Sequence, residues 1–76
     1  MEGFTHGDYD IFPGAKLIDV EGMPIKWMAC ATAIRKSGNA NSVDWDKFPV
    51  FDTEKEACLF AATTIKNMID TGEISI

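Results

Sequence analysis

The clearest pattern of apolar and polar positions lies between Phe51 and Gly72. Apolar or small side chains recur every three or four residues in this segment, as they do along one face of a helix. These positions are Ala57, Phe60, Ala61, Thr64, Ile65, Met68 and Ile69. The pattern predicts one amphipathic helix of about five turns.

Both ends of this helix carry local signals. Thr53 is followed three residues later by Glu56, which is the spacing of a capping box. Asp52 and Glu54 add negative charge where the helix dipole favours it. Gly72 follows the last periodic residue, as a glycine beyond a helix C-terminus does. We therefore expect the helix to begin after Thr53 and to end before Gly72.

Three strands are predicted before the helix. The longest covers residues 25–36, and a short one covers residues 45–51. The first in the chain covers residues 15–20, either alone or continued from residues 9–12 across a kink at Pro13-Gly14. Turn residues separate them at 21–24 and 37–44. The order predicts an α+β fold, β-β-β-α, in which a three-stranded antiparallel sheet is packed on one face by a single C-terminal helix.

The chain of 76 residues is long enough for one domain. Residues 1–7 contain two glycines and no periodicity, so we expect a flexible N-terminal arm before a single domain of residues 8–76. The tail at 73–76 alternates apolar and polar residues, so it either adds a short strand or covers the core.

The longest predicted strand is apolar on both of its faces, which is unusual for a strand with one solvated face. We place Met28, Cys30 and Ile34 under the helix, because their larger side chains can meet its apolar face. The other set would form an open interaction face of Trp27, Ala29, Ala31, Ala33 and Arg35. The opposite assignment stays open, because alanines also allow a helix to approach closely.

An uncovered apolar sheet face typically marks an interaction site. We therefore expect a small non-enzymatic module that binds another protein or associates with itself as a dimer. The alternative is that the N-terminal arm or the tail folds over this face. The aromatic residues Trp45, Phe48 and Phe51 are interpreted as core residues rather than as a ligand site.

The charge of the chain argues against several partners. Twelve acidic and seven basic residues give a net charge of −5, which disfavours non-specific binding to nucleic acid or to anionic membranes. No apolar run approaches the ~18 residues of a membrane span. The first ten residues lack the pattern of a signal peptide. We therefore expect no membrane association and a cytoplasmic location.

Few residues suggest chemistry. His6 lies near Asp8 and Asp10 in the predicted arm, which could form a weak metal site, but converging ligands and supporting contacts are not evident. The glycines form no phosphate-binding motif. Cys30 and Cys58 lie in apolar runs and are interpreted as free buried thiols, with a single disulfide as the alternative. We expect no metal, no cofactor and no catalysis.

A nucleic-acid-binding sheet face is the alternative function. Trp27 could stack on a base, while Arg35 and Lys36 could contact phosphates. The acidic balance and the single arginine argue against it.

The segments KWMACATAIRKSG and FPVFDTEKEACLFAATTIKNMIDTGE carry a resemblance to known families. Their strand–loop–strand–helix pattern resembles that of AP2-type and phage-integrase arm-binding domains, over about residues 25–73. The FDT-x-x-E-A helix start and ID-x-G helix end are still more similar to those of small uncharacterised bacterial β-β-β-α proteins. Both resemblances imply this fold. The AP2-type resemblance also implies DNA binding through the sheet, for which only Trp27 and Arg35 match, because the segment AKLIDV lacks that family's arginines.

Overall fold

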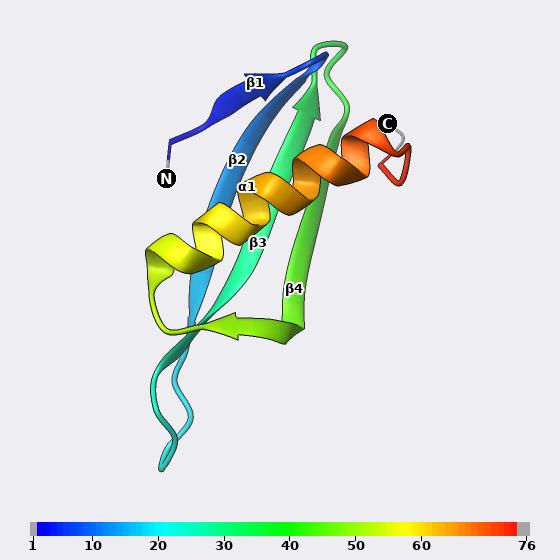
Figure 1. The fold of residues 1–76 in the computed structure, drawn as a ribbon. Helices are drawn as coiled ribbons and strands as arrows, with labels where there is room; N and C mark the ends of the chain where they lie inside the picture. The colour runs from blue at the N-terminus through cyan, green and yellow to red at the C-terminus, as the bar shows by residue number, and fades with distance from the viewer. Residues whose placement is uncertain (1, 75–76) are drawn as a thin grey trace.

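The structure is a computed structural model that describes residues 2–74, without the side chains of residues 46–48. Four strands precede one helix: β1 (Phe4–His6), β2 (Tyr9–Ile18), β3 (Lys26–Arg35), β4 (Ala40–Phe51) and α1 (Glu54–Asp70). The strands form an antiparallel sheet in the order β1-β2-β3-β4, and α1 lies across one face of it (Figure 1). The predicted α+β fold is confirmed, with four strands in place of three.

The N-terminal segment differs from the prediction of a flexible arm. Residues 4–6 form β1, which pairs with β2 through a tight turn that contains Gly7 at a φ of 61°. Glycine adopts this left-handed conformation without steric cost. Backbone pairing therefore fixes a segment whose side chains show no periodicity.

β2 runs without interruption through Pro13 and Gly14, where the sequence predicts either a kink or the start of a separate strand. The carbonyl of Asp8 accepts a hydrogen bond of 2.9 Å from the N–H of Lys36, so the even-numbered residues of β2 direct their backbone groups toward β3. Pro13 belongs to the other set, and its missing N–H removes no bond of the β2–β3 ladder. Proline is therefore tolerated inside this strand.

β4 begins at Ala40, inside the predicted loop of residues 37–44, because it pairs with β3 along the register Ala40↔Ile34 to Trp45↔Ala29. The register then shifts between Met28 and Ala29, so that Met28 is paired with Val50. This bulge bends β4 sharply across toward the start of α1 (Figure 1).

The helix begins and ends as predicted. The Thr53 hydroxyl oxygen accepts a bond of 3.2 Å from the N–H of Glu56, and it also lies 3.1 Å from the Glu56 carboxylate, to which it donates. Gly72 follows the last turn with a φ of 81°, and the N–H of Ile74 donates to the carbonyl of Met68. Ile74 is buried, so this part of the tail covers the core, which is one of the two alternatives predicted for residues 73–76. Residues 75–76 lie outside the described part of the chain.

The core lies between α1 and the face of the sheet that carries alanines. Ala29 and Ala33 of β3 are fully buried, as are Ala57 and Ala61 of α1. Small side chains on both layers let the helix approach the sheet closely. Ile11 of β2 and Ile65 of α1 supply the two largest fully buried apolar side chains of this core.

Aromatic side chains close one end of the core. The ring of Phe60 packs edge-on against Trp45 at a centroid distance of 5.4 Å and against Phe51 at 5.3 Å. Both partners lie against the core cluster, which confirms their prediction as core residues. The side chain of Phe48 lies outside the described part of the chain.

Candidate interaction surface

The prediction that the alanine face of β3 is open is wrong. Ala29, Ala31 and Ala33 are buried beneath α1, and Trp27 is half-buried against the same core. The helix covers the alanine face because a residue without a long side chain lets two backbones approach, and this was the opposite assignment left open by the sequence. Of the five predicted residues, only Arg35, at the end of β3, is exposed.

The face away from the helix therefore carries Met28, Cys30 and Ile34, each of which is half-buried. Polar contacts cross this face between strands, and the contact between Lys16 and Asp44 reaches from β2 across β3 to β4. They join Thr5 to Asp10, Lys16 to Asp44 and Thr32 to Ser42, at 3.1, 3.3 and 3.0 Å. This mixture of apolar and paired polar groups is typical of a solvated sheet face.

A shallow hollow of about 260 Å³ lies at the β1–β2 end of the molecule. It is lined by Gly3, Phe4, Thr5, Asp10 and Phe12. Its carboxylate, on Asp10, already accepts a bond from the Thr5 hydroxyl. The carboxylate that lines the hollow is therefore already hydrogen-bonded within the protein.

The largest group of exposed apolar side chains lies instead at the turn that joins β2 and β3. Leu17, Val20, Met23 and Ile25 are 51%, 53%, 65% and 56% exposed. Figure 1 shows that this hairpin projects beyond α1 and the rest of the sheet, in a molecule whose longest extent is 45 Å. We call residues 17–25 the hairpin tip.

The turn at the tip has a defined conformation. The N–H of Met23 donates to the carbonyl of Val20 at 3.0 Å, and Gly22 has a φ of 82°. A turn with this bond and a positive φ at its third residue favours glycine there, as the sequence predicted. The apolar side chains are thus held on a closed turn.

The tip continues the apolar face of the core. Leu17 is paired with Trp27, and both belong to the set of residues that faces the helix side of the sheet. α1 covers Trp27 in part and leaves Leu17 exposed. The apolar surface therefore runs outward from the core, past the helix, to the tip.

The charges at the tip have one sign. Asp19 and Glu21 are the only charged residues between Leu17 and Ile25. Among the described residues, the ion pairs join His6 to Asp70, Lys16 to Asp44 and Lys26 to Asp52, so neither acid of the tip is neutralised by a neighbour. The tip combines exposed apolar side chains with two acidic residues, and the flanking Lys16 and Lys26 are paired with Asp44 and Asp52.

The residues of the nucleic-acid alternative do not share a surface. Trp27 and Arg35 lie at opposite ends of β3, eight residues apart and about 26 Å along the strand. The Arg35 guanidinium lies 6.0 Å from the Tyr9 ring centroid, and Lys36 follows in the turn beyond. Arg35 and Lys36 are neighbours, but the structure does not bring them to Trp27.

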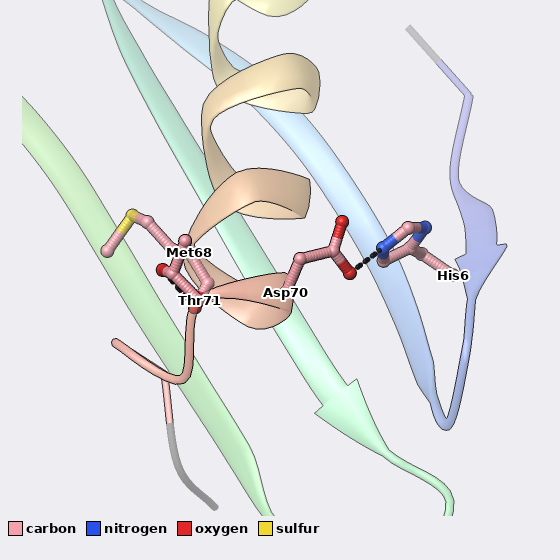
Figure 2. A network of polar contacts seen from close by, with 4 residues as sticks. All are labelled: His6, Met68, Asp70 and Thr71. Carbon is pink, nitrogen blue, oxygen red and sulfur yellow. Dashed lines mark hydrogen bonds and ion pairs between the residues drawn. The ribbon is translucent and has the colours of Figure 1, made fainter.

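His6 has a structural partner that the sequence did not indicate. Its Nε2 lies 2.8 Å from Asp70 Oδ1 at the end of α1 (Figure 2), whereas the sequence suggested Asp8 and Asp10 as its neighbours. Among residues 2–74, no group of three or more His, Cys, Asp or Glu side chains is placed to hold a metal ion.

The two cysteines are free thiols, as predicted. Cys58 is buried on α1, whereas Cys30 is half-buried on the opposite face of the sheet. Burial, and then the negative charge of Asp44, raise the pKa of the Cys30 thiol. The thiol is therefore held in its protonated, weakly nucleophilic form.

The hairpin tip was missed because its apolar residues flank a turn. The segment LIDVEGMPI was divided into a strand and a turn, and no periodicity marked its side chains as exposed. The available signal was the density of large apolar residues on both sides of Gly22 and Pro24, where turns are usually polar.

Among the described residues, no helix is both long enough and apolar enough to cross a membrane. Comparisons with protein-family models, with curated proteins and with solved structures found no match for this chain. A functional inference for this chain therefore rests on its residues and their geometry alone.

Proposed function

We propose that this protein is a non-enzymatic interaction module that binds a protein partner through its hairpin tip. The observation that carries the proposal is the exposure of Leu17, Val20, Met23 and Ile25, each more than half accessible, on one projecting turn. Exposed apolar groups that gather in one place tend to mark interaction sites, because their removal from water drives association.

The rest of the fold supports this use of the tip. β2 and β3 are paired over ten positions, from Tyr9↔Arg35 to Ile18↔Lys26, so the tip is anchored to the core by a continuous ladder. A surface that is already ordered loses less conformational entropy on binding than a flexible loop would. The hairpin therefore presents its apolar groups in a conformation that suits a partner.

A triple variant tests the proposal: Val20→Thr, Met23→Gln and Ile25→Thr. These changes replace exposed apolar groups by polar groups of similar size, outside the helix–sheet core. Leu59→Gln is the matched control, because Leu59 is 48% exposed on α1, away from the tip. Both proteins should keep the thermal stability of the parent chain.

Affinity capture with quantitative mass spectrometry, together with light scattering on a sizing column, gives the readout. We expect the triple variant to lose the partner, or the dimer if the partner is a second copy, and the Leu59→Gln control to keep it. Retention of the same partners, or of the same molar mass, by the triple variant would exclude the tip as the binding surface.

A further inference from the structure

We infer that the partner adds an extended, basic and apolar segment as a new strand to the outer edge of β2, beside the hairpin tip. This inference rests on the function proposed above, and it specifies the mode of binding and the chemistry of the partner. Two observations carry it: an open stretch of strand edge, and the sign of the charge next to it.

The outer edge of β2 is only partly covered. β1 pairs with β2 from Tyr9 to Ile11, whereas β2 continues to Ile18. β1 leaves the sheet toward its N-terminal end, and no strand of the described residues pairs with the outer side of residues 12–18 (Figure 1). This stretch leads directly into the hairpin tip.

The register identifies the backbone groups that the edge offers. Because the β2–β3 pairing has no shift, the alternation set by the Asp8–Lys36 hydrogen bond continues along the whole strand. Gly14 and Lys16 therefore direct their N–H and C=O groups toward β3, while Ala15 and Leu17 direct theirs outward. An added strand would find donors and acceptors at Ala15 and Leu17.

Natural sheets usually protect such an edge with proline, with charge or with a very short strand. Pro13 protects its own position, because it belongs to the outward set and has no N–H. Ala15 and Leu17 carry neither device, and the Lys16 side chain is held on the sheet face by Asp44. The edge is therefore protected next to β1 and open next to the tip.

The charge at the tip selects the partner. Asp19 and Glu21 lie at the end of the open edge. The basic residues that flank the tip, Lys16 and Lys26, are paired with Asp44 and Asp52, and the whole chain carries −5. Electrostatic complementarity favours a segment with Lys or Arg at the positions that reach the tip. Apolar residues on its alternate positions would lie beside Ala15 and Leu17, as strand addition with side-chain specificity requires.

A second copy of this chain fits the edge less well. Twofold antiparallel pairing around Lys16 would place Ile18 of one copy opposite Gly14 of the other, and would direct the turn beyond Ile18 toward Ile11. Phe4 of β1 already pairs with Ile11 there, and the acidic residues of both tips would gain no basic partner. The occupant is therefore a segment of a different protein.

The test is a selection of random linear peptides displayed on phage, with the complete chain as the immobilised target. Ala15→Pro removes one outward N–H, and Pro13 shows that this set of positions accommodates proline. Ala15→Ser is the matched control, since it keeps the N–H. Enriched peptides should alternate Lys or Arg with apolar residues, and they should bind Ala15→Pro about tenfold more weakly than Ala15→Ser.

The outcomes separate this inference from the proposed function. Peptides that are weakened by Met23→Gln and not by Ala15→Pro would overturn strand addition and leave the tip as the binding surface. The inference would be overturned if the selected peptides bound both variants as tightly as the parent chain. It would also be overturned if their consensus sequence were acidic, or if the selection enriched no peptide. A dimer dissociated by Ala15→Pro would overturn it in favour of a second copy.

Amide exchange of the unaltered chain keeps the inference testable if Ala15→Pro does not fold. A bound peptide should slow the exchange of the Ala15 and Leu17 amides, and leave that of Gly14 and Lys16 unchanged. Slowing at residues 19–25 alone, without an effect at Ala15 and Leu17, would overturn strand addition.

Discussion

The imidazole of His6 lies 2.8 Å from the carboxylate of Asp70, which joins β1 to the last residue of α1 (Figure 2). The last turn of α1 has no basic residue of its own, and the Asp70 carboxylate is paired with His6 of β1 instead. The contact thus links the outer strand of the sheet to the helix that covers the core.

This contact should contribute modestly to stability. The Asp70 side chain is 61% exposed, and pairs of this kind contribute about 0.2–1 kcal/mol. A double-mutant cycle with His6→Ala and Asp70→Ala, measured by urea denaturation, should give a coupling free energy in that range. Purely additive effects of the two changes would show that β1 and α1 are not linked through this pair.

The face of the sheet that α1 covers can be tested on adjacent residues of β3. Ala31 is 3% exposed under the helix, so Ala31→Leu should overpack the core and lower the free energy of unfolding by about 1–3 kcal/mol. Thr32→Leu lies on the other face, and should cost less than about 1 kcal/mol. Thermal and urea denaturation of both variants gives the comparison, and a larger cost for Thr32→Leu would reverse the face assignment.

The start of α1 depends on one hydroxyl group. Thr53→Ala removes the acceptor of the Glu56 N–H and should lower the free energy of unfolding by about 1 kcal/mol. Thr53→Ser keeps the hydroxyl group and serves as the control, with a change of a few tenths. Equal destabilisation by the two substitutions would indicate that the Thr53 methyl group, and not the cap, stabilises this end.

The end of α1 depends on the left-handed backbone conformation of Gly72. A Cβ on Gly72 would meet nothing within 4 Å, so Gly72→Ala should cost about 1–2 kcal/mol through its positive φ alone. The chain is short enough for chemical synthesis, and D-alanine at position 72 is the matched control because its preferred φ is positive. Similar stability of the L- and D-alanine proteins would contradict this account of the helix end.

The Cys30 thiol should react slowly and depend on pH in a defined direction. Its raised pKa means that the folded protein holds the thiol proton more tightly than the unfolded chain does. The associated stability is complete below about pH 8.5, the ordinary thiol range, and is lost as pH rises through the higher pKa of the folded state. Denaturation followed across this range should show the decline, and Cys30→Ala should remove it.

Alkylation gives an independent measure of the same thiol. In a Cys58→Ala background, iodoacetamide should modify Cys30 more slowly in the folded protein than in denaturant. Asp44→Asn should speed the reaction, because it removes the charge that raises the pKa after burial. A folded thiol that reacts as fast as the denatured one would contradict both explanations.

The helix was predictable because its signals are local. Thr53, Glu56 and Gly72 act on the backbone groups of their own turn, and the apolar period reports one buried face. The start of β4 at Ala40 was not predictable in this way. Its polar residues form a strand because β3 offers an edge, which is a property of the assembled sheet.

The candidate site was beyond local reasoning for a related reason. Both faces of β3 are apolar, and the choice between Ala31 and Met28 depends on how closely α1 approaches. Once α1 covers the alanines, the largest group of exposed apolar residues is the one that lies beyond the helix, at the hairpin tip. That outcome depends on the length of the hairpin relative to α1, which no single segment encodes.

The open edge of β2 is central to the inferred mode of binding, and amide hydrogen exchange of the free protein by NMR tests it most directly. The account predicts alternation: the Gly14 and Lys16 amides, which face β3, should exchange at least about tenfold more slowly than those of Ala15 and Leu17, which face outward. Equal protection of all four amides would mean that the outer edge is already paired, and it would contradict the account.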